Sequence, residues 1–284
     1  MISKRLRMLN RVCGTRFARR LLSIPAAEHQ TDADAYFHQS RLEAGSFLES
    51  YGAKGTVAGR RVLDLGCGLG ARTLAAARAG AVEVVGIDND AEKIHRALEE
   101  ARRSATQGVA FAVQSGSELA FAKGRFDVVL LLDVIEHLGE PAAVLCECAR
   151  ILREGGRVLV GFPPYRSPWG GHLFSHVPVP WVHLLFRDRE VLDLWREVHA
   201  EAAARGEVRC SSRRARAIIE AESTAALWDC NGMTVGRFLD LVDRAPLELA
   251  DIRFKVLGNL GGIVTKSSRL REVLTTRVMA VLEA

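Results

Sequence analysis

The 284-residue sequence lacks an apolar run long enough to cross a membrane. It also lacks a C-x-x-C pair, although it contains six cysteines. We interpret these cysteines as reduced thiols of a cytoplasmic protein, not as a disulfide framework or a zinc site. Aromatic residues make up only 6% of the chain, whereas hydrophobic residues make up 48%. This composition argues against a fibrous or low-complexity protein and suits helices that alternate with buried strands.

Acidic residues are absent from residues 1–27, which carry seven Lys and Arg side chains. The rest of the chain carries 32 basic and 34 acidic side chains, so its balance is −2 although the whole chain carries +5. A near-neutral body argues against a nucleic-acid-binding face, which needs cations spread over its surface. We therefore predict no nucleic-acid partner.

Residues 1–30 are predicted to be a separate N-terminal segment with a basic amphipathic helix over about 1–25. Apolar side chains recur there at helical spacing between Arg and Lys, namely Ile2, Leu6, Leu9, Cys13 and Phe17. Docking on the rest of the protein, disorder, and attachment of residues 1–25 to the anionic inner face of a membrane all stay open. The segment lacks the continuous apolar region of a signal peptide.

Strands and helices are expected to alternate from residue 31 onward. Thr31 or Asp32 caps a helix that continues to about Tyr51. Buried strands are expected at 61–65, 82–87, 109–113, 126–132 and 157–162. Helices are expected after the glycine turn at 66–70, over 91–104, and from Pro141 to Gly155-Gly156. This alternation predicts a doubly wound, mostly parallel sheet covered by helices on both faces.

The regular alternation stops after Pro163-Pro164 and returns with a helix at 234–244 and strands at 248–256 and 276–282. Residues 163–231 are too long for a plain loop and are predicted to be a largely helical insertion over the active site. Their apolar and aromatic stretch at 163–186 suits a bulky acceptor, and it equally suits a lid that packs on the domain. A basic run could meet an anionic group or form a solvated helix face: Arg209, Arg213, Arg214 and Arg216.

A glycine turn follows the first expected strand in the segment VLDLGCGLG, residues 62–70. With Ala71 it also satisfies the dinucleotide pattern G-x-G-x-x-G/A, so a nicotinamide-dependent oxidoreductase must be weighed. Asp64 precedes the glycines, where a carboxylate can serve a cationic ligand rather than a pyrophosphate. Asp88 ends the second strand, and the fourth strand runs into the acidic and histidine-containing segment LLLDVIEHL, residues 130–138. Ligands of such sheets bind at the carboxyl ends of the strands.

These segments resemble the motifs of class I S-adenosylmethionine (SAM) dependent methyltransferases, including those of ubiquinone and menaquinone biosynthesis. VLDLGCGLG resembles the first motif, VVGIDND the second, FDVVLLLDVIEHL the fourth, and LREGGRVLVGFPP the segment around the fifth strand. The resemblance covers about residues 35–165 and, more loosely, 232–283. It implies a Rossmann-like seven-stranded fold over 31–284, SAM as the cofactor, and methyl transfer as the activity.

The resemblance also implies roles for individual residues. Gly66, Cys67 and Gly68 would line the methionine part through their backbone, with Asp64 nearby. Asp88 would hold the ribose and Asn89 would flank the adenine. Many family members carry an acid after the third strand that meets the adenine amino group, whereas this chain has Ser115 followed by Gly116. Leu132 and Asp133 would face the methionine from the fourth strand.

His137 is the first candidate for a catalytic base because it follows the fourth strand, beside the expected methyl group. Tyr165 and His172 are the next candidates, because they follow the fifth strand where the acceptor is expected. We predict no metal ion, although Asp133, Glu136 and His137 resemble the corresponding segment of methyltransferases that use one. The predicted function is methyl transfer to a small-molecule acceptor, on oxygen in preference to nitrogen or carbon. A non-catalytic SAM-binding module and a nicotinamide-dependent oxidoreductase are the alternatives.

Overall fold

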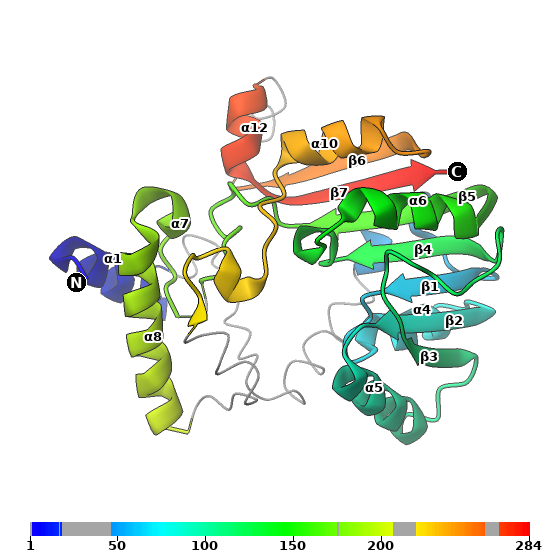
Figure 1. The fold of residues 1–284 in the computed structure, drawn as a ribbon, viewed down its shortest axis with the longest axis horizontal. Coiled ribbons are helices and arrows are strands. Elements are labelled where there is room, and N and C mark those ends of the chain that lie inside the picture. The colour runs from blue at the N-terminus through cyan, green and yellow to red at the C-terminus, as the bar shows by residue number, and fades with distance from the viewer. Residues whose placement is uncertain (1, 17, 19–46, 175, 207–219, 259–266) are drawn as a thin grey trace. The chain divides into compact units, whose positions relative to one another are not determined.

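The computed structural model describes residues 2–16, 18, 47–174, 176–206, 220–258 and 267–284 (Figure 1). The chain groups into two compact units, and each is described by itself. The helical unit comprises Met1–Tyr36, Pro163–Val235 and Phe254–Arg277. The sheet unit comprises Phe37–Phe162, Gly236–Arg253 and Val278–Ala284.

Seven strands form one sheet in the order β3-β2-β1-β4-β5-β7-β6. Strands β1 to β5 pair in parallel, and β7 runs antiparallel to β5. This confirms the predicted Rossmann-like, mostly parallel seven-stranded sheet. The bounds are β1 Arg61–Leu65, β2 Glu83–Asp88, β3 Val109–Val113, β4 Phe126–Leu132, β5 Leu152–Phe162, β6 Glu248–Val256 and β7 Thr275–Glu283.

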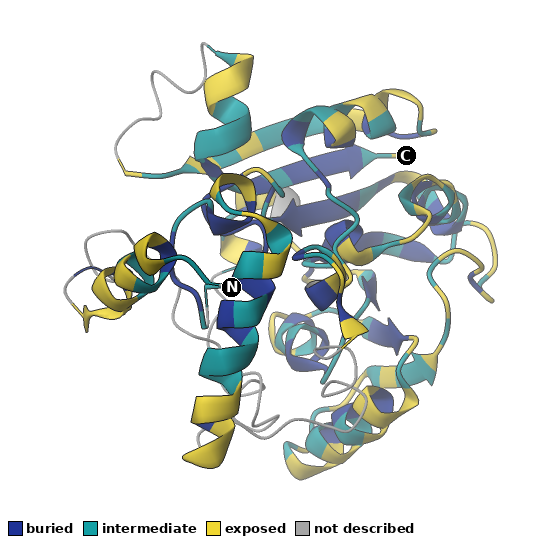
Figure 2. Cartoon of the chain, turned by 60° about the vertical axis from the view of Figure 1, so that its left-hand side comes forward, coloured by how far each residue is buried: buried dark blue, intermediate teal, exposed yellow. Residues whose placement is uncertain are grey.

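The central strands are buried along almost their whole length, as the colouring of Figure 2 shows. Their sequences RVLDL, EVVGID and FDVVLLL are near-continuous apolar runs, which is typical of strands covered on both faces. Val62, Val84, Val128 and Leu159 join one core cluster from four neighbouring strands. Since β1 and β4 are adjacent in the sheet but not in the sequence, the strand order reverses beside β1. Ligands of open α/β sheets bind at that reversal.

Helices connect the parallel strands: α4 Ala71–Arg78, α5 Ala91–Arg103 and α6 Pro141–Ile151. Asp90 caps α5, because its side chain accepts hydrogen bonds from the N–H groups of Glu92 and Lys93. Helix α10, Val235–Asp243, precedes β6. The short 3-10 helix η1, Gly52–Gly55, precedes β1. Of the helix predicted from Thr31 or Asp32 to Tyr51, residues 31–46 lie outside the described residues.

The prediction that the helix from Pro141 ends at Gly155-Gly156 is wrong. Helix α6 ends at Ile151, and β5 begins at Leu152 and contains both glycines. The pairing of β4 with β5 shifts register there, because Phe126 pairs with Leu152 whereas Val128 pairs with Arg157. Gly155 has φ +68°, and a Cβ on Gly156 would lie 2.8 Å from the Arg153 carbonyl oxygen. The glycines therefore permit an irregularity within a strand instead of ending a helix.

The helical unit contains α1 Lys4–Gly14, α7 Val182–Leu185, α8 Asp188–Ala204, η3 Ala226–Trp228 and α12 Ser268–Leu274. Its core joins segments that are far apart in the sequence: Leu6 and Cys13 of α1, Trp169, Val182 of α7, Trp195 of α8 and Leu227. Residues 209–216, with the basic run, lie outside the described residues. In the described part of the chain, no helix combines the length and apolarity needed to cross a membrane.

Candidate functional site

The glycine turn after β1 needs glycine at three positions for two different reasons. Gly66, Gly68 and Gly70 all have positive φ, at +73°, +55° and +82°. A Cβ on Gly66 would lie 2.5 Å from Val134 Cγ2, and one on Gly70 would lie 2.9 Å from the Phe111 ring. A Cβ on Gly68 would meet no atom within 4 Å. Close packing against Val134 and Phe111 therefore explains why Gly66 and Gly70 have no side chain. At Gly68 no atom of the described residues is close, so the space beside the turn is open to a ligand.

Asp88, at the carboxyl end of β2, ties the glycine turn to the sheet. Its carboxylate accepts hydrogen bonds from the N–H groups of Gly68 and Asp90, each at 3.0 Å. The Lys93 ammonium lies 3.9 Å away. Asp88 is buried, whereas its neighbour Asn89 is exposed. A buried carboxylate at the end of a central strand, beside an open turn, is suited to accept hydrogen bonds from a ligand's hydroxyl groups.

Asp64 lies inside β1 and is almost fully buried, with 2% of its surface exposed. The Thr73 hydroxyl of α4 donates a 2.7 Å hydrogen bond to its carboxylate. Burial raises the pKa of Asp64, and the hydrogen bond from Thr73 opposes that rise only in part. The buried Cys67 thiol also has a raised pKa because of burial. Cys67 is therefore a thiol and not a nucleophilic thiolate at neutral pH.

Arg72, a residue that the sequence did not single out, organises the end of β4. It lies in the first turn of α4, donates a 2.6 Å hydrogen bond to the Leu132 carbonyl oxygen, and forms an ion pair with Asp133. Asp133 has φ +57°, so its backbone is in the left-handed region. Its N–H donates to the Gly161 carbonyl oxygen of β5. A cation in the first turn of a helix is unusual, because the positive end of the helix dipole disfavours it there. This position of Arg72 was the signal in the sequence that could have identified it as a functional residue.

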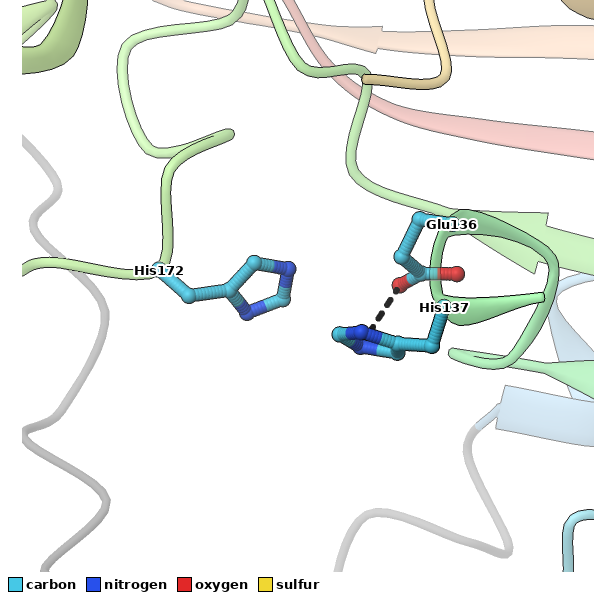
Figure 3. Close-up of side chains that lie close together, drawn as sticks. All are labelled: Glu136, His137 and His172. Atoms are coloured by element: carbon cyan, nitrogen blue, oxygen red, sulfur yellow. Dashed lines mark ion pairs between the residues drawn. The ribbon is translucent and has the colours of Figure 1, made fainter. Parts of the chain in front are cut away.

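The 3-10 helix η2, Ile135–His137, follows directly and carries the histidine expected as a base. The His137 Nε2 atom lies 3.9 Å from the Glu136 Oε1 atom (Figure 3). The Glu136 side chain is only 4% exposed, whereas the His137 side chain is 32% exposed. A buried carboxylate beside a solvent-accessible imidazole can orient that imidazole.

The loop after β3 holds Ser115 and Gly116. Ser115 is exposed, and its hydroxyl lies 2.9 Å from that of Ser117. A Cβ on Gly116 would lie 3.1 Å from Leu65 Cδ2, so the loop passes close to the end of β1. Hydroxyl groups thus occupy the stretch where the resemblance expects a carboxylate.

Tyr165 and His172, the other catalytic candidates, belong to the helical unit, and Figure 3 also labels His172. The Tyr165 hydroxyl is hydrogen-bonded to Thr224, and burial raises its pKa. Its carbonyl oxygen lies 2.6 Å from His183 Nε2. His172 has φ +54°, and its N–H donates to the Trp169 carbonyl oxygen at 3.0 Å. The sheet unit thus contains His137 together with every residue expected to bind the cofactor.

Comparison with known proteins gives independent support for a methyltransferase domain. The methyltransferase-domain family model matches residues 63–160. A ubiquinone biosynthesis O-methyltransferase from Methylococcus capsulatus is 39% identical over 104 residues, which are 36% of this chain and 43% of that protein. The chain thus aligns with less than half the length of this relative.

Solved structures share the fold. A SAM-dependent methyltransferase from Mesorhizobium loti superposes with a TM-score of 0.51 at 15% identity, covering 84% of this chain and 96% of that one. The [4+2]-cyclase SpnF superposes with a TM-score of 0.52 at 15% identity, covering 86% and 80%. The fold is therefore shared by proteins of different chemistry. The domain match thus identifies a methyltransferase domain at residues 63–160, and the solved structures show that the chain shares the fold of SAM-dependent methyltransferases.

Proposed function

We propose that this protein transfers the methyl group of SAM to a small-molecule acceptor, in preference through an oxygen atom. The observation that carries the proposal is the buried Asp88 carboxylate at the end of β2, joined to the open glycine turn at Gly68. The name of the Methylococcus capsulatus relative supports an oxygen acceptor. The apolar and aromatic stretch at 163–186 supports a bulky or apolar acceptor.

We propose that SAM would be held at the carboxyl ends of β1 and β2. Asp88 would accept hydrogen bonds from the ribose hydroxyls, and Asn89 would flank the adenine. The turn at Gly66, Cys67 and Gly68 would line the methionine part. The negative charge of Asp64 and Asp133 favours the cationic amino and sulfonium groups. Leu132 forms part of the same wall.

Methyl transfer is an in-line displacement in which the acceptor oxygen bonds to the methyl carbon as the sulfur–carbon bond breaks. S-adenosylhomocysteine leaves, and the hydroxyl proton must go to a base. The protein mainly aligns the reacting atoms, which can contribute roughly 7–11 kcal/mol. His137 is the proposed base, with Glu136 beside it, and general-base catalysis typically contributes about 10²–10⁴-fold. Tyr165 and His172 are proposed to position the acceptor.

Two measurements test the proposal. Calorimetric titration of the full chain with SAM and, separately, with NADH distinguishes the family's cofactor from that of a nicotinamide-dependent oxidoreductase. Incubation with SAM carrying a labelled methyl group, and with organic and aqueous fractions of a cell extract, then measures S-adenosylhomocysteine release and label transfer. We expect SAM binding and label in an acceptor from the organic fraction. SAM binding with no turnover in any fraction would instead support the non-catalytic module.

His137→Ala separates the base from the cofactor site. We expect turnover to fall by about 10²-fold or more while the Kd for SAM changes by less than about threefold. Turnover equal to that of the unmodified protein would remove His137 as the base. His95→Ala is the matched control, because His95 is an exposed histidine on α5 of the same unit.

A further inference from the structure

Two helices of the helical unit expose large apolar side chains to solvent. On α1, Met8 and Val12 are 59% and 56% exposed. On α7, Leu184 and Leu185 are 44% and 66% exposed. Among the described residues, these four are half of the exposed large hydrophobic side chains. Single exposed apolar side chains are common on protein surfaces. A group of them on two helices indicates a surface that binds a protein or a membrane.

Helix α1 has two apolar stripes, and only one of them is buried. Leu6 and Cys13 pack into the core of the helical unit. Arg5, Met8 and Val12 follow one another at spacings of three and four residues, so they share another face. Lys4 and Arg11 are also exposed, and α1 contains no acidic residue. The outward face of α1 is therefore both apolar and cationic.

Ionic contacts hold α1 in this orientation beside α8 (Figure 1). The Ser3 N–H donates a 2.7 Å hydrogen bond to Glu190, and Arg7 forms an ion pair with Glu197. The contact with Arg7 lowers the pKa of Glu197, so the pair is charged at neutral pH. Glu190 and Glu197 of α8 are thus already engaged by Ser3 and Arg7.

Arg5 connects the outward face of α1 to α7. Its guanidinium carbon lies 5.9 Å from the centroid of the Phe186 ring, which follows Leu185 directly. The exposed leucines therefore lie next to the cationic and apolar face of α1. We define the α1–α7 face as Lys4, Arg5, Met8, Arg11, Val12, Leu184 and Leu185.

We propose that the α1–α7 face docks the protein on the surface of an anionic lipid bilayer. Apolar side chains between exposed cations are typical of helices that lie in a membrane interface. The cations stay at the level of the headgroups while the apolar side chains enter the acyl boundary. A protein partner fits less well, because charged residues as a class are depleted at the centres of protein interfaces. This inference does not depend on the methyl acceptor.

Vesicle co-sedimentation of the full chain tests the proposal. We expect binding to vesicles of phosphatidylcholine with phosphatidylglycerol, and weak binding to phosphatidylcholine alone. The triple variant Lys4→Gln/Arg5→Gln/Arg11→Gln should lose about 100-fold in affinity at low salt, since each cation near an anionic surface contributes about fivefold. The variant Leu184→Ser/Leu185→Ser should lose at least tenfold, also at high salt, where only the apolar contribution persists.

The matched control is Val82→Ser/Val113→Ser, which removes two exposed valines of the sheet unit that are 67% and 51% exposed. It should leave vesicle binding unchanged, and all variants should keep the Kd for SAM. Failure of the unmodified protein to bind anionic vesicles would overturn the proposal. Light scattering that shows a dimer, together with a monomer for Leu184→Ser/Leu185→Ser, would assign the face to a second copy instead.

Discussion

The sheet unit and the helical unit differ in how their cores are encoded. In the sheet unit, α4, α5 and α6 follow β1, β2 and β4, and the residues expected to bind the cofactor lie at or just after the carboxyl ends of β1 to β4. In the helical unit, α1 packs its Leu6 against residues more than 150 positions away, such as Trp169 and Trp195. The residues expected to bind the cofactor thus lie in short segments that a local sequence pattern can identify. The rest of the protein depends on contacts between distant segments.

The largest expected effect comes from breaking the helical unit at its long-range contact. Leu6 is fully buried in the core of that unit. Leu6→Ala should lower the free energy of unfolding of the helical unit by about 2–5 kcal/mol, because it removes buried apolar contacts and leaves a cavity. Urea denaturation followed by hydrogen exchange of α8 measures this loss.

Met8→Ala is the control for that experiment, because Met8 is exposed on the same helix. It should change the free energy of unfolding by less than about 0.5 kcal/mol. If Leu6→Ala lowers the SAM affinity of the sheet unit as much as it lowers the protection of α8, the comparison between the two units fails.

The second effect is expected in the sheet unit. Asp88→Ala should weaken SAM binding by about 1–3 kcal/mol, because the ribose hydroxyls lose charge-assisted hydrogen bonds. Calorimetric titration gives the Kd. Asp90→Ala, two residues on, should cost about 1 kcal/mol of stability through the lost cap of α5 while SAM affinity stays nearly constant. Equal affinity of Asp88→Ala and the unmodified protein would contradict the ribose role.

The difference between the units also explains what the sequence predicted. The bounds of β1, β3, β4 and β6 agree with the expected strands, since alternation of buried strands and capped helices is a local signal. Gly155-Gly156 misled the prediction, because a glycine pair can end a helix or bend a strand, and only the pairing of β4 with β5 distinguishes the two.

Within the candidate site, the sequence identified the carboxylates but not what holds them. The ion pair of Arg72 with Asp133 joins the start of α4 to the end of β4, two segments about 60 residues apart. The unusual position of Arg72 in the first turn of α4 marks the residue but not its partner, because the contact depends on β1 and β4 being neighbours in the sheet. The roles of Tyr165 and His172 remain predictions for the same reason: their surroundings come from packing within the helical unit.

The third prediction concerns Asp64, where burial raises the pKa above the ordinary value of 3.8. A raised pKa means that the folded protein holds this proton more tightly than the unfolded chain does. The corresponding stability is present at low pH and is lost as the pH rises through the raised pKa. Asp64→Asn removes this pH-dependent loss of stability, because the amide does not ionise. Its oxygen still accepts the hydrogen bond from the Thr73 hydroxyl. The variant should therefore unfold at an equal or higher temperature than the unmodified protein above that pKa.

The same variant should bind SAM about tenfold more weakly, since it lacks the negative charge proposed to favour the cationic cofactor. Thermal unfolding without cofactor from pH 4 to pH 8, together with SAM titration at pH 8, measures both effects. Thr73→Val is the matched change, because it leaves the carboxylate and removes its hydrogen-bond donor. A variant Asp64→Asn that is less stable at pH 8 and binds SAM normally would make Asp64 a structural residue.

The smallest expected effect adds a contact instead of removing one. Ser115 stands where many relatives are expected to carry an acid that meets the adenine amino group, and it is exposed. Ser115→Asp should tighten SAM binding by about two- to tenfold, which is the net contribution of one hydrogen bond. Ser117→Asp adds the same charge two residues away, also at an exposed position, and should leave the Kd unchanged. If both variants tighten binding equally, the gain comes from net charge near a cationic ligand, and the adenine does not lie beside Ser115.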